Sequence, residues 1–497
     1  MSGIRVTYAG LISFVTGLVS VITGIIFTLI VTRQLTAVEL GTWSLIGGLV
    51  SYVIIIESTI SYWTTREIAR GKESGRTALL SSGIVSIFAL FIYLVIIHYV
   101  APQSKINSDV LLYGSILIPV MFLFRILSAI NYGWKPHSLS ITNIVFEIVK
   151  IPLGFYFVYI EHMSVIGAII SITIAYAVSI VILAIYAKDK LKNKVNLQFL
   201  KKWFRLSWLS LYPEIPGLLS KLDILVFTLV TGMIIGISYY TAAITIASLV
   251  VQAGSISRAV YPKLLEAGNK NEFLSENLIR LFYFIIPLTA ISFVFVRPAL
   301  FALNPIYEIA TQITILVIVK TLFNTLSSVF YPILTGAETV DVDENSKFRD
   351  YTKSKLFSLP TFQIVQYSVY IIALFVGLVL LKTNSQLEQT TFWAAIMLIC
   401  EIPLTVYLYK TLRKNFTIKL DKKSLVKYLV TSISVFSIMY VVTDHFLEYK
   451  KSIFEFLPNL LLFVMIGVFA YIIITYFIDD RTKSLFSAIM KEFLNRT

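Results

Sequence analysis

The chain has 497 residues, of which 57% are hydrophobic and only 14% are charged. Ordinary soluble proteins carry about a quarter charged residues, so this composition excludes a soluble globular domain. The net charge of +14 does not indicate nucleic-acid binding, because the basic residues lie in connections between apolar runs of about 20 residues or more. Such runs predict an all-α integral membrane protein, whereas a β-barrel would show alternating segments of about ten residues.

In chain order, the apolar runs predict fourteen transmembrane helices. Residues 6–32 carry no charge and exceed the apolar core of a cleavable signal, so we expect them to form the first span. The connections are mostly short, so consecutive helices are expected to be antiparallel neighbours. The predicted spans are 6–32, 40–63, 77–100, 109–132, 139–160, 164–187, 203–231, 233–257, 274–296, 306–333, 358–381, 391–409, 424–443 and 453–478.

Lysine and arginine are distributed unequally between the two sides of these spans. One side, which includes both termini, collects 30 of the 42 basic residues, and the other side collects six. The positive-inside rule therefore predicts a multi-pass protein of the cell (plasma) membrane with cytoplasmic N- and C-termini. The basic surface would face anionic membrane lipids.

The sequence also contains an internal repeat. SILIPVMFLFRILSAINY at 115–132 matches TILVIVKTLFNTLSSVFY at 314–331 in eight of 18 positions, and Ser20 and 27–29 match Ser220 and 227–229. The shift covers six spans, so the two copies share one orientation, as in transporters built from parallel repeats. We expect an N-terminal lobe at 1–187, a cytoplasmic linker at 188–202, a C-terminal lobe at 203–412, and two extra helices with a cytoplasmic tail at 413–497.

The seventh span, SWLSLYPEIPGLLSKLDILVFT at 207–228, contains two prolines and three charges. On one helix, its polar residues from Ser207 to Thr228 would share a face, and Pro213 and Pro216 predict a bend. Lipid cannot satisfy such a polar stripe, so the stripe must face protein or water. Similar stripes follow spans one, two and eight, which predicts a central hydrated cavity. Stripes of small residues and hydroxyls are equally typical of tight helix packing.

Charges at membrane depth are costly and usually functional, so they provide the candidate site residues. The candidates for substrate binding in this cavity are Lys221, Lys320, Arg258, Lys150, Arg125, Ser20, Ser210 and Gln252. The candidates for coupling to an ion are Glu57, Glu214, Asp223 and Glu401. Two structural alternatives remain open, because Glu147 and Lys150 are spaced to neutralise each other, and Arg125 and Arg258 lie close enough to span ends to reach the surface.

Four short segments follow one another along the chain: VTRQLTAVELGTWSL at 31–45, TTREIARGK at 64–72, SVIGAIIS at 164–171 and AVYPKL at 259–264. In this order they resemble segments of the polysaccharide-type flippases of the multidrug/oligosaccharidyl-lipid/polysaccharide (MOP) exporter superfamily. The first segment is similar to the first connection of that family, with Thr36 in place of its usual first glycine. The resemblance implies a V-shaped, MATE-like fold of two pseudo-symmetric six-helix lobes, and translocation of a lipid-linked oligosaccharide.

The sequence therefore predicts a monomeric, non-enzymatic transporter that flips a polyprenyl phosphate- or pyrophosphate-linked oligosaccharide to the outer leaflet by alternating access. Coupling to H⁺ or Na⁺ is expected, with no cofactor, since the chain lacks a nucleotide-binding loop and its four histidines have no metal-ligand spacing. One alternative is a multidrug or cation antiporter of the same superfamily, although residues 6–32 lack the acidic residue on which such proteins commonly depend. A second is a membrane glycosyltransferase or ligase, although the predicted outer connections are short.

Overall fold

The computed structural model describes residues 23–24, 26–104, 106–135, 137–205, 207, 211–258, 270–336, 338, 352–381, 383, 385–484 and 487. Secondary structure in these residues is helical, without a β-strand. Within this part of the chain, twelve helical segments are long and apolar enough to cross a membrane, and each overlaps one predicted span. The predicted span 40–63 is not one helix, because a turn at residues 55–56 divides it between the helices Ala37–Ile54 and Glu57–Ala69. Of the remaining two predicted spans, most of 6–32 and the predicted site residue Ser20 lie outside the described residues. The total of fourteen spans therefore stays a prediction.

The described helices group into two compact units. Unit 2 contains the described residues up to 241 together with 360–396, and unit 1 contains 242–359 and the described residues from 397 onward. The boundary falls inside α12 (Ile235–Arg258), α18 (Lys355–Leu380) and α19 (Gln386–Asn415), so these three helices contribute to both units. The predicted lobes follow the sequence repeat, whereas the units follow spatial contact, and residues 203–241 consequently fall with the first six spans.

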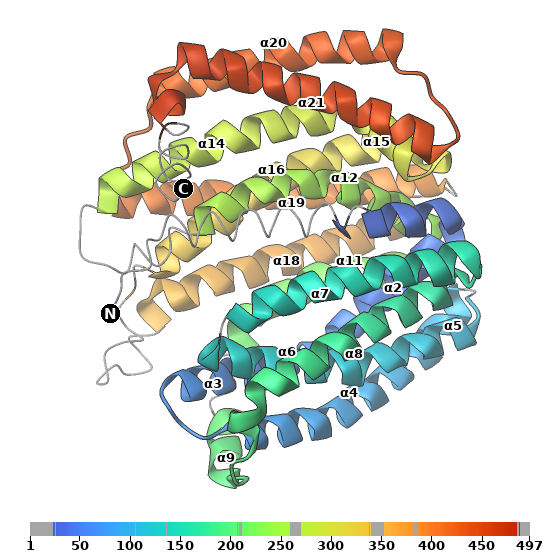
Figure 1. The fold of residues 1–497 in the computed structure, drawn as a ribbon, viewed down its shortest axis with the longest axis vertical. Helices are drawn as coiled ribbons and strands as arrows, with labels where there is room; N and C mark the ends of the chain where they lie inside the picture. Colours follow the sequence, from blue (N-terminus) through green and yellow to red (C-terminus); the bar gives the residue numbers. More distant parts are fainter. Residues whose placement is uncertain are drawn as a thin grey trace. The chain divides into compact units, whose positions relative to one another are not determined.

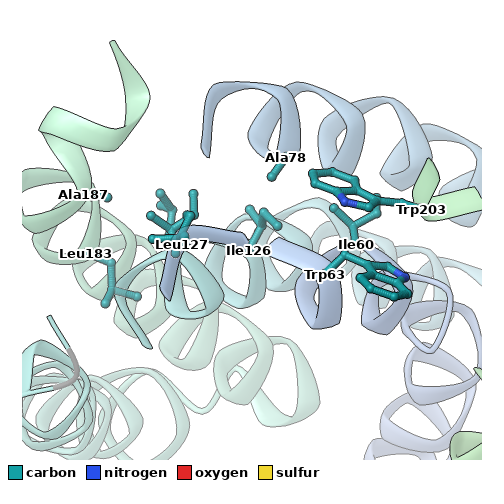
Figure 2. Packing of buried hydrophobic residues seen from close by; sticks show 10 residues of the cluster. Ile60, Trp63, Ala78, Ile126, Leu127, Leu183, Ala187 and Trp203 are labelled. Carbon is teal, nitrogen blue, oxygen red and sulfur yellow. The ribbon is translucent and has the colours of Figure 1, made fainter. Parts of the chain in front are cut away.

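Unit 2 is built mainly on α2 (Ala37–Ile54), α3 (Glu57–Ala69), α4 (Gly75–Ser104), α6 (Leu117–Trp134), α7 (His137–Gly154) and α8 (Ser164–Leu191) (Figure 1). The short α5 (Ser108–Tyr113) precedes α6. Near the ends that are predicted to be cytoplasmic, α3, α4, α6 and α8 enclose an apolar core in which Ile60, Trp63 and Ile126 are buried. Figure 2 shows these side chains converging with Trp203 from the linker helix α9 (Leu197–Arg205).

In the segment 203–231, where we expected one bent helix, residues 206 and 208–210 lie outside the described residues. Leu211 is helical, and a 3₁₀ turn at Tyr212–Glu214 leads directly into α11 (Ile215–Thr231). Pro213 lies in this turn and Pro216 in the first turn of α11, so the regular α-helix is interrupted at the place where the two prolines predicted a bend. At 17 residues, α11 is about 26 Å long, slightly less than the roughly 30 Å hydrocarbon core.

Unit 1 contains α14 (Lys270–Val294), α15 (Val296–Leu303) and α16 (Thr311–Gly336), and the helical hairpin of α20 (Lys422–Phe446) and α21 (Ile453–Ile478). A carboxylate directly after α21 holds this hairpin together. Asp479 accepts hydrogen bonds from Tyr428 and Ser424, each at 2.8 Å, and from the backbone N–H of Thr482 at 3.1 Å. Burial alone would raise the pKa of Asp479, but these hydrogen bonds keep it below its ordinary value.

Candidate functional site

Two neighbouring helices of unit 2 present polar faces with the same spacing. The face on α3 contains Glu57, Ser61 and Thr65, each together with the residue that follows it in the sequence. The face on α6 contains Arg125, Ser128 and residues adjacent to them in the sequence. Steps of four and one follow the helical period, so each set lies on one side of its helix. The opposite sides supply the apolar core, and α3 and α6 therefore separate that core from a polar space.

This polar space is an open cavity of about 490 Å³. The 3₁₀ turn before α11 contributes Glu214 as a third wall. Every lining residue belongs to unit 2, and all three walls lie near the end that the basic-residue pattern predicts to be cytoplasmic. The lining residues are Glu57, Ser58, Ser61, Tyr62, Thr65, Arg66, Phe124, Arg125, Ser128, Ala129, Tyr132 and Glu214.

Close contact between α3 and α6 fixes the shape of the cavity. Thr65 Oγ1 donates a hydrogen bond to the carbonyl of Ala129 at 3.1 Å, which joins the two polar faces directly. Gly133 allows this approach, because a Cβ at that position would lie 2.7 Å from the carbonyl oxygen of Thr65. The backbones of α3 and α6 are consequently closely packed at this contact, which fixes the positions of the side chains around it.

The cavity carries four charged groups of two signs. Glu57 is buried, with 1% of its surface exposed, and accepts a hydrogen bond from Ser61. It occupies the first turn of α3, where the helix dipole favours a negative charge. Arg125 is close enough to act electrostatically on Glu57. Glu214 is exposed on the third wall.

Both arginines keep hydrogen-bonding capacity for a ligand. Arg66 and Arg125 are exposed, and neither forms an ion pair within the part of the chain that the structure describes. The Arg66 guanidinium stacks over the Tyr62 ring at 4.4 Å from its centroid, which orients its donors without using them. A planar guanidinium binds phosphate oxygens in a bidentate manner. Tyr62, Tyr132 and the serine hydroxyls suit a polyhydroxylated ligand beside that phosphate.

Outside the cavity, the carboxylate of Asp223 of α11 is buried at the centre of an aromatic cluster in unit 2. Only 4% of Asp223 is exposed, and Tyr370 of α18 donates a hydrogen bond to its carboxylate at 3.0 Å. Trp393 Nε1 of α19 donates to the Tyr370 hydroxyl at 2.8 Å. The indole stacks against Tyr240 and Phe227, at 4.0 and 4.8 Å between ring centroids. This network connects α11 and α12 to the segments of α18 and α19 that belong to unit 2.

A third buried carboxylate, Glu401 of α19, lies in unit 1. Asn324 Nδ2 of α16 donates to it at 3.3 Å, and Thr405 contacts Ser327 at 2.8 Å one turn further along. Lys320 lies one helical turn before Asn324 and so shares the face of α16 that carries Asn324. The predicted residues Lys320 and Glu401 are both residues of unit 1, and neither lines the cavity on α3 and α6.

The other predicted substrate-binding residues do not line the cavity. Lys150 forms an ion pair with Glu147 at 2.7 Å and lies 5.1 Å from the Phe27 ring centroid, so it has the structural pairing that its spacing allowed. Lys221 is exposed, and its backbone carbonyl accepts a hydrogen bond from Tyr52. Gln252 reaches the carbonyl of Ser248 at 3.5 Å. Ser210 and the side chain of Arg258 lie outside the described residues.

The hydroxyl stripes have their donors satisfied largely within their own helices. Thr42, Ser44 and Ser51 of α2 each donate to the carbonyl four residues earlier. Thr241 of α12 donates to its own helix and lies 2.7 Å from the hydroxyl oxygen of Ser44. Hydroxyls bonded in this way are compatible with tight apolar packing. Their spacing alone therefore does not indicate a cavity.

Sequence reasoning identified Glu57, Arg125 and Glu214 but missed Arg66 and its aromatic partner. The predicted second span ended at residue 63, so Arg66 was assigned to a basic connection after the membrane. The spacing itself contained the missing signal, because Thr65 and Arg66 continue the periodicity of Glu57 and Ser61 for one more turn.

Comparison with known proteins indicates the fold. No protein-family model matches the chain, and none of the curated proteins matches its sequence. Among solved structures, lipid II flippase MurJ in an inward closed conformation aligns over 94% of this chain and 98% of its own, at 17% identity and a TM-score of 0.63. An inward-facing multidrug resistance MATE family transporter of the MOP superfamily aligns over 80% of this chain and 95% of its own, at 14% identity and a TM-score of 0.57.

The chain has the fold of the MOP-superfamily transporters. A further MATE structure, in complex with MaL6, agrees at 13% identity and a TM-score of 0.52, over 82% of this chain and 96% of its own. This is the MATE-like fold that the resemblance of the short segments implied. Together with the twelve apolar helices, it makes the protein a multi-pass membrane protein whose structural neighbours are transporters.

Proposed function

We propose that the protein is a flippase for a lipid-linked oligosaccharide, and that the cavity on α3 and α6 receives the phosphate-bearing head group. The observation that supports this most strongly is the pair Arg66 and Arg125, exposed in one cavity beside tyrosine and serine hydroxyls. The polar head of such a lipid cannot cross about 30 Å of hydrocarbon unaided. A cavity that replaces its hydration lowers this barrier, while the polyprenyl tail stays in the bilayer.

The two carboxylates of the same cavity supply a mechanism for ion coupling. A phosphate that binds Arg125 withdraws that positive charge from Glu57 and adds negative charge to a site that already contains Glu214. Uptake of H⁺ by the buried Glu57 would offset the added charge, because a buried carboxylate near other anions favours its neutral form. Proton uptake on binding and release after translocation would couple transport to a proton gradient. Asp223 and Glu401 remain candidates for a second coupling step, with Na⁺ as the alternative ion.

The location of the cavity suits loading from the cytoplasmic leaflet of the plasma membrane. Its walls are α3, the second half of α6 and the turn after the basic linker, and all three adjoin connections predicted to be cytoplasmic. MOP-fold transporters include proteins described as a lipid flippase and as multidrug transporters, so both activities are compatible with this architecture.

One feature favours a second function, export of an organic cation. Glu57 and Glu214 line the cavity together with three aromatic side chains, Tyr62, Phe124 and Tyr132, and this combination binds cations as well. In that case the carboxylates would hold the substrate, and loss of the arginines would have little effect or would increase affinity.

Equilibrium binding by the purified protein separates these functions. The probes are a polyprenyl pyrophosphate-linked oligosaccharide and a lipophilic organic cation. Arg125→Gln and Arg66→Gln should each weaken binding of the anionic probe by about ten- to a hundredfold, since a charged hydrogen bond contributes roughly 1.5–3 kcal/mol. Arg413→Gln is the matched control, because Arg413 also stacks over a tyrosine, at 6.0 Å from the Tyr409 ring centroid, but lies outside the cavity. Weakened cation binding in Glu57→Gln, with unchanged anion binding in both arginine variants, would establish the antiporter and refute the flippase.

A further inference from the structure

The linker between the sixth and seventh predicted spans forms a basic surface at the edge of unit 2. Residues 188–205, KDKLKNKVNLQFLKKWFR, contain seven lysines or arginines and one aspartate, a net charge of +6. The linker leaves α8, a membrane-crossing helix, at Leu191 and contains the short helix α9. This charge is therefore placed where a helix leaves the hydrocarbon, at the level of lipid head groups.

Helix α9 is fixed in its rotation by one buried face. Trp203 has no exposed surface and packs in the core beside Ile60 and Ala78 (Figure 2). Phe199, one turn earlier, stacks on it at 5.9 Å between ring centroids. Since Trp203 holds α9 against α3 and α4, the orientation of its other faces is determined.

A second face of α9 is apolar and exposed. Leu197 and Phe204 are seven residues apart, so they lie on the same side of the helix, and they are 71% and 52% exposed. Lys201 lies between them on that side, and Arg205 lies at its edge. An apolar strip bordered by cations is the pattern of a helix that lies in the plane of a membrane interface.

The neighbouring ends of α6 and α8 carry a second group of basic and aromatic side chains. Trp134, the last residue of α6, is 42% exposed. Lys190 of α8 lies 4.1 Å from its ring centroid, and Lys135 lies 5.8 Å away. Tryptophan concentrates at the membrane–water interface, and lysine near it binds lipid phosphate. Val195, 43% exposed, lies between this cluster and α9.

We infer that α9 and the Trp134–Lys190 cluster form a binding surface for anionic phospholipids, with Leu197 and Phe204 inserted among the lipids and the lysines on their phosphates. Charge complementarity identifies the occupant, because an apolar partner protein would not require six net positive charges around two exposed apolar side chains. The inference is independent of the transported substrate and applies equally to a flippase and to a cation antiporter.

The surface is also coupled to the cavity through shared helices. Trp203 packs against Ile60 of α3 in a core that also contains Ile126 of α6, and the opposite faces of these two helices line the cavity. A lipid that holds α9 in place would therefore stabilise the α3–α6 wall that carries Arg66 and Arg125.

Site-specific labelling of the full-length protein tests the inference. Cys400 is the single cysteine, so Cys400→Ser gives a background in which Leu197→Cys is labelled with a polarity-sensitive fluorophore. Titration of phosphatidylglycerol into the detergent-solubilised protein should shift the emission of this label to shorter wavelength, and phosphatidylcholine should not. A label at Gln198→Cys, about 100° around the helix, should respond far less.

Charge removal provides the second arm of the experiment. Lys190→Gln, Lys194→Gln and Lys201→Gln together should move the titration midpoint to about a hundredfold more phosphatidylglycerol, because each cation near an anionic surface contributes roughly fivefold. Removal of three exposed cations elsewhere, by Lys419→Gln, Lys422→Gln and Lys423→Gln, should leave it unchanged. The inference is overturned by an unshifted Leu197 label, by equal shifts with both lipids, or by an unmoved midpoint in the linker variant. Size-exclusion profiles matching the background protein establish that each variant is folded.

Discussion

Replacing Tyr370 by phenylalanine should destabilise unit 2, because one hydroxyl serves two hydrogen bonds in its interior. The hydroxyl donates to Asp223 at 3.0 Å and accepts from Trp393 Nε1 at 2.8 Å, and both bonds are buried. Each polar contact between membrane helices contributes about 1–2 kcal/mol. Loss of both should therefore cost roughly 2–4 kcal/mol, and the stacked rings around Trp393 would keep their apolar contacts.

Thermal unfolding of the detergent-solubilised protein measures this loss. For a unit of this size the expected decrease in Tm is about 4–8 °C. Tyr440→Phe is the matched control, since Tyr440 is 58% exposed and loses the same atom without breaking a buried bond. A cycle with Asp223→Asn should give a coupling energy above about 0.5 kcal/mol between Asp223 and Tyr370. If Tyr370→Phe unfolds at the same temperature as Tyr440→Phe, the network does not hold α11 to α18 and α19.

Three further substitutions test packing and electrostatics. Gly41→Ala should destabilise the protein by about 1–3 kcal/mol, because its Cβ would lie 2.3 Å from a backbone oxygen, whereas Gly47→Ala, with open space around it, should not; both are read from Tm. Lys150→Met should lower the free energy of unfolding by roughly 3–5 kcal/mol, because it leaves the Glu147 carboxylate unpaired. If Lys150 has only a structural role, adding Glu147→Leu should restore both stability and transport. The pKa of Asp479 is lowered in the folded protein, so its carboxylate stabilises the fold at pH values above its ordinary pKa and loses this effect as the pH falls through its pKa in the folded state. The Tm difference between wild type and Asp479→Asn should therefore shrink on acidification. A constant difference would contradict the lowered pKa.

Sequence reasoning was most successful where a single physical constraint dominates. The length and apolarity of membrane spans leave little freedom, so twelve predicted spans overlap observed helices, although the span 40–63 is divided between two. The i, i+3 spacing of Glu147 and Lys150 correctly allowed their ion pair, because both residues lie on one turn of one helix.

It was least successful where the outcome depends on local backbone geometry or distant contacts. Pro213 and Pro216 are compatible with both a bend and a helix start, and the sequence does not predict the 3₁₀ turn at Tyr212–Glu214 that lies beside them. The spacing of the serine and threonine residues does not predict that their hydroxyl groups donate hydrogen bonds to carbonyls of the same helix. The position of Asp223 beside Tyr370, 147 residues away in sequence, depends on tertiary packing that no local pattern encodes.

The central claim is that the cavity on α3 and α6 carries an anionic lipid-linked glycan head across the bilayer. Its most direct test is translocation of a fluorescent polyprenyl pyrophosphate-linked oligosaccharide in proteoliposomes of wild-type protein and of Arg66→Gln/Arg125→Gln. The wild type should transfer the head group to the opposite leaflet faster than protein-free vesicles, and the double variant should transfer it at the protein-free rate. Equal transfer with and without protein would contradict the flippase, and undiminished transfer by the double variant would remove this cavity from the pathway.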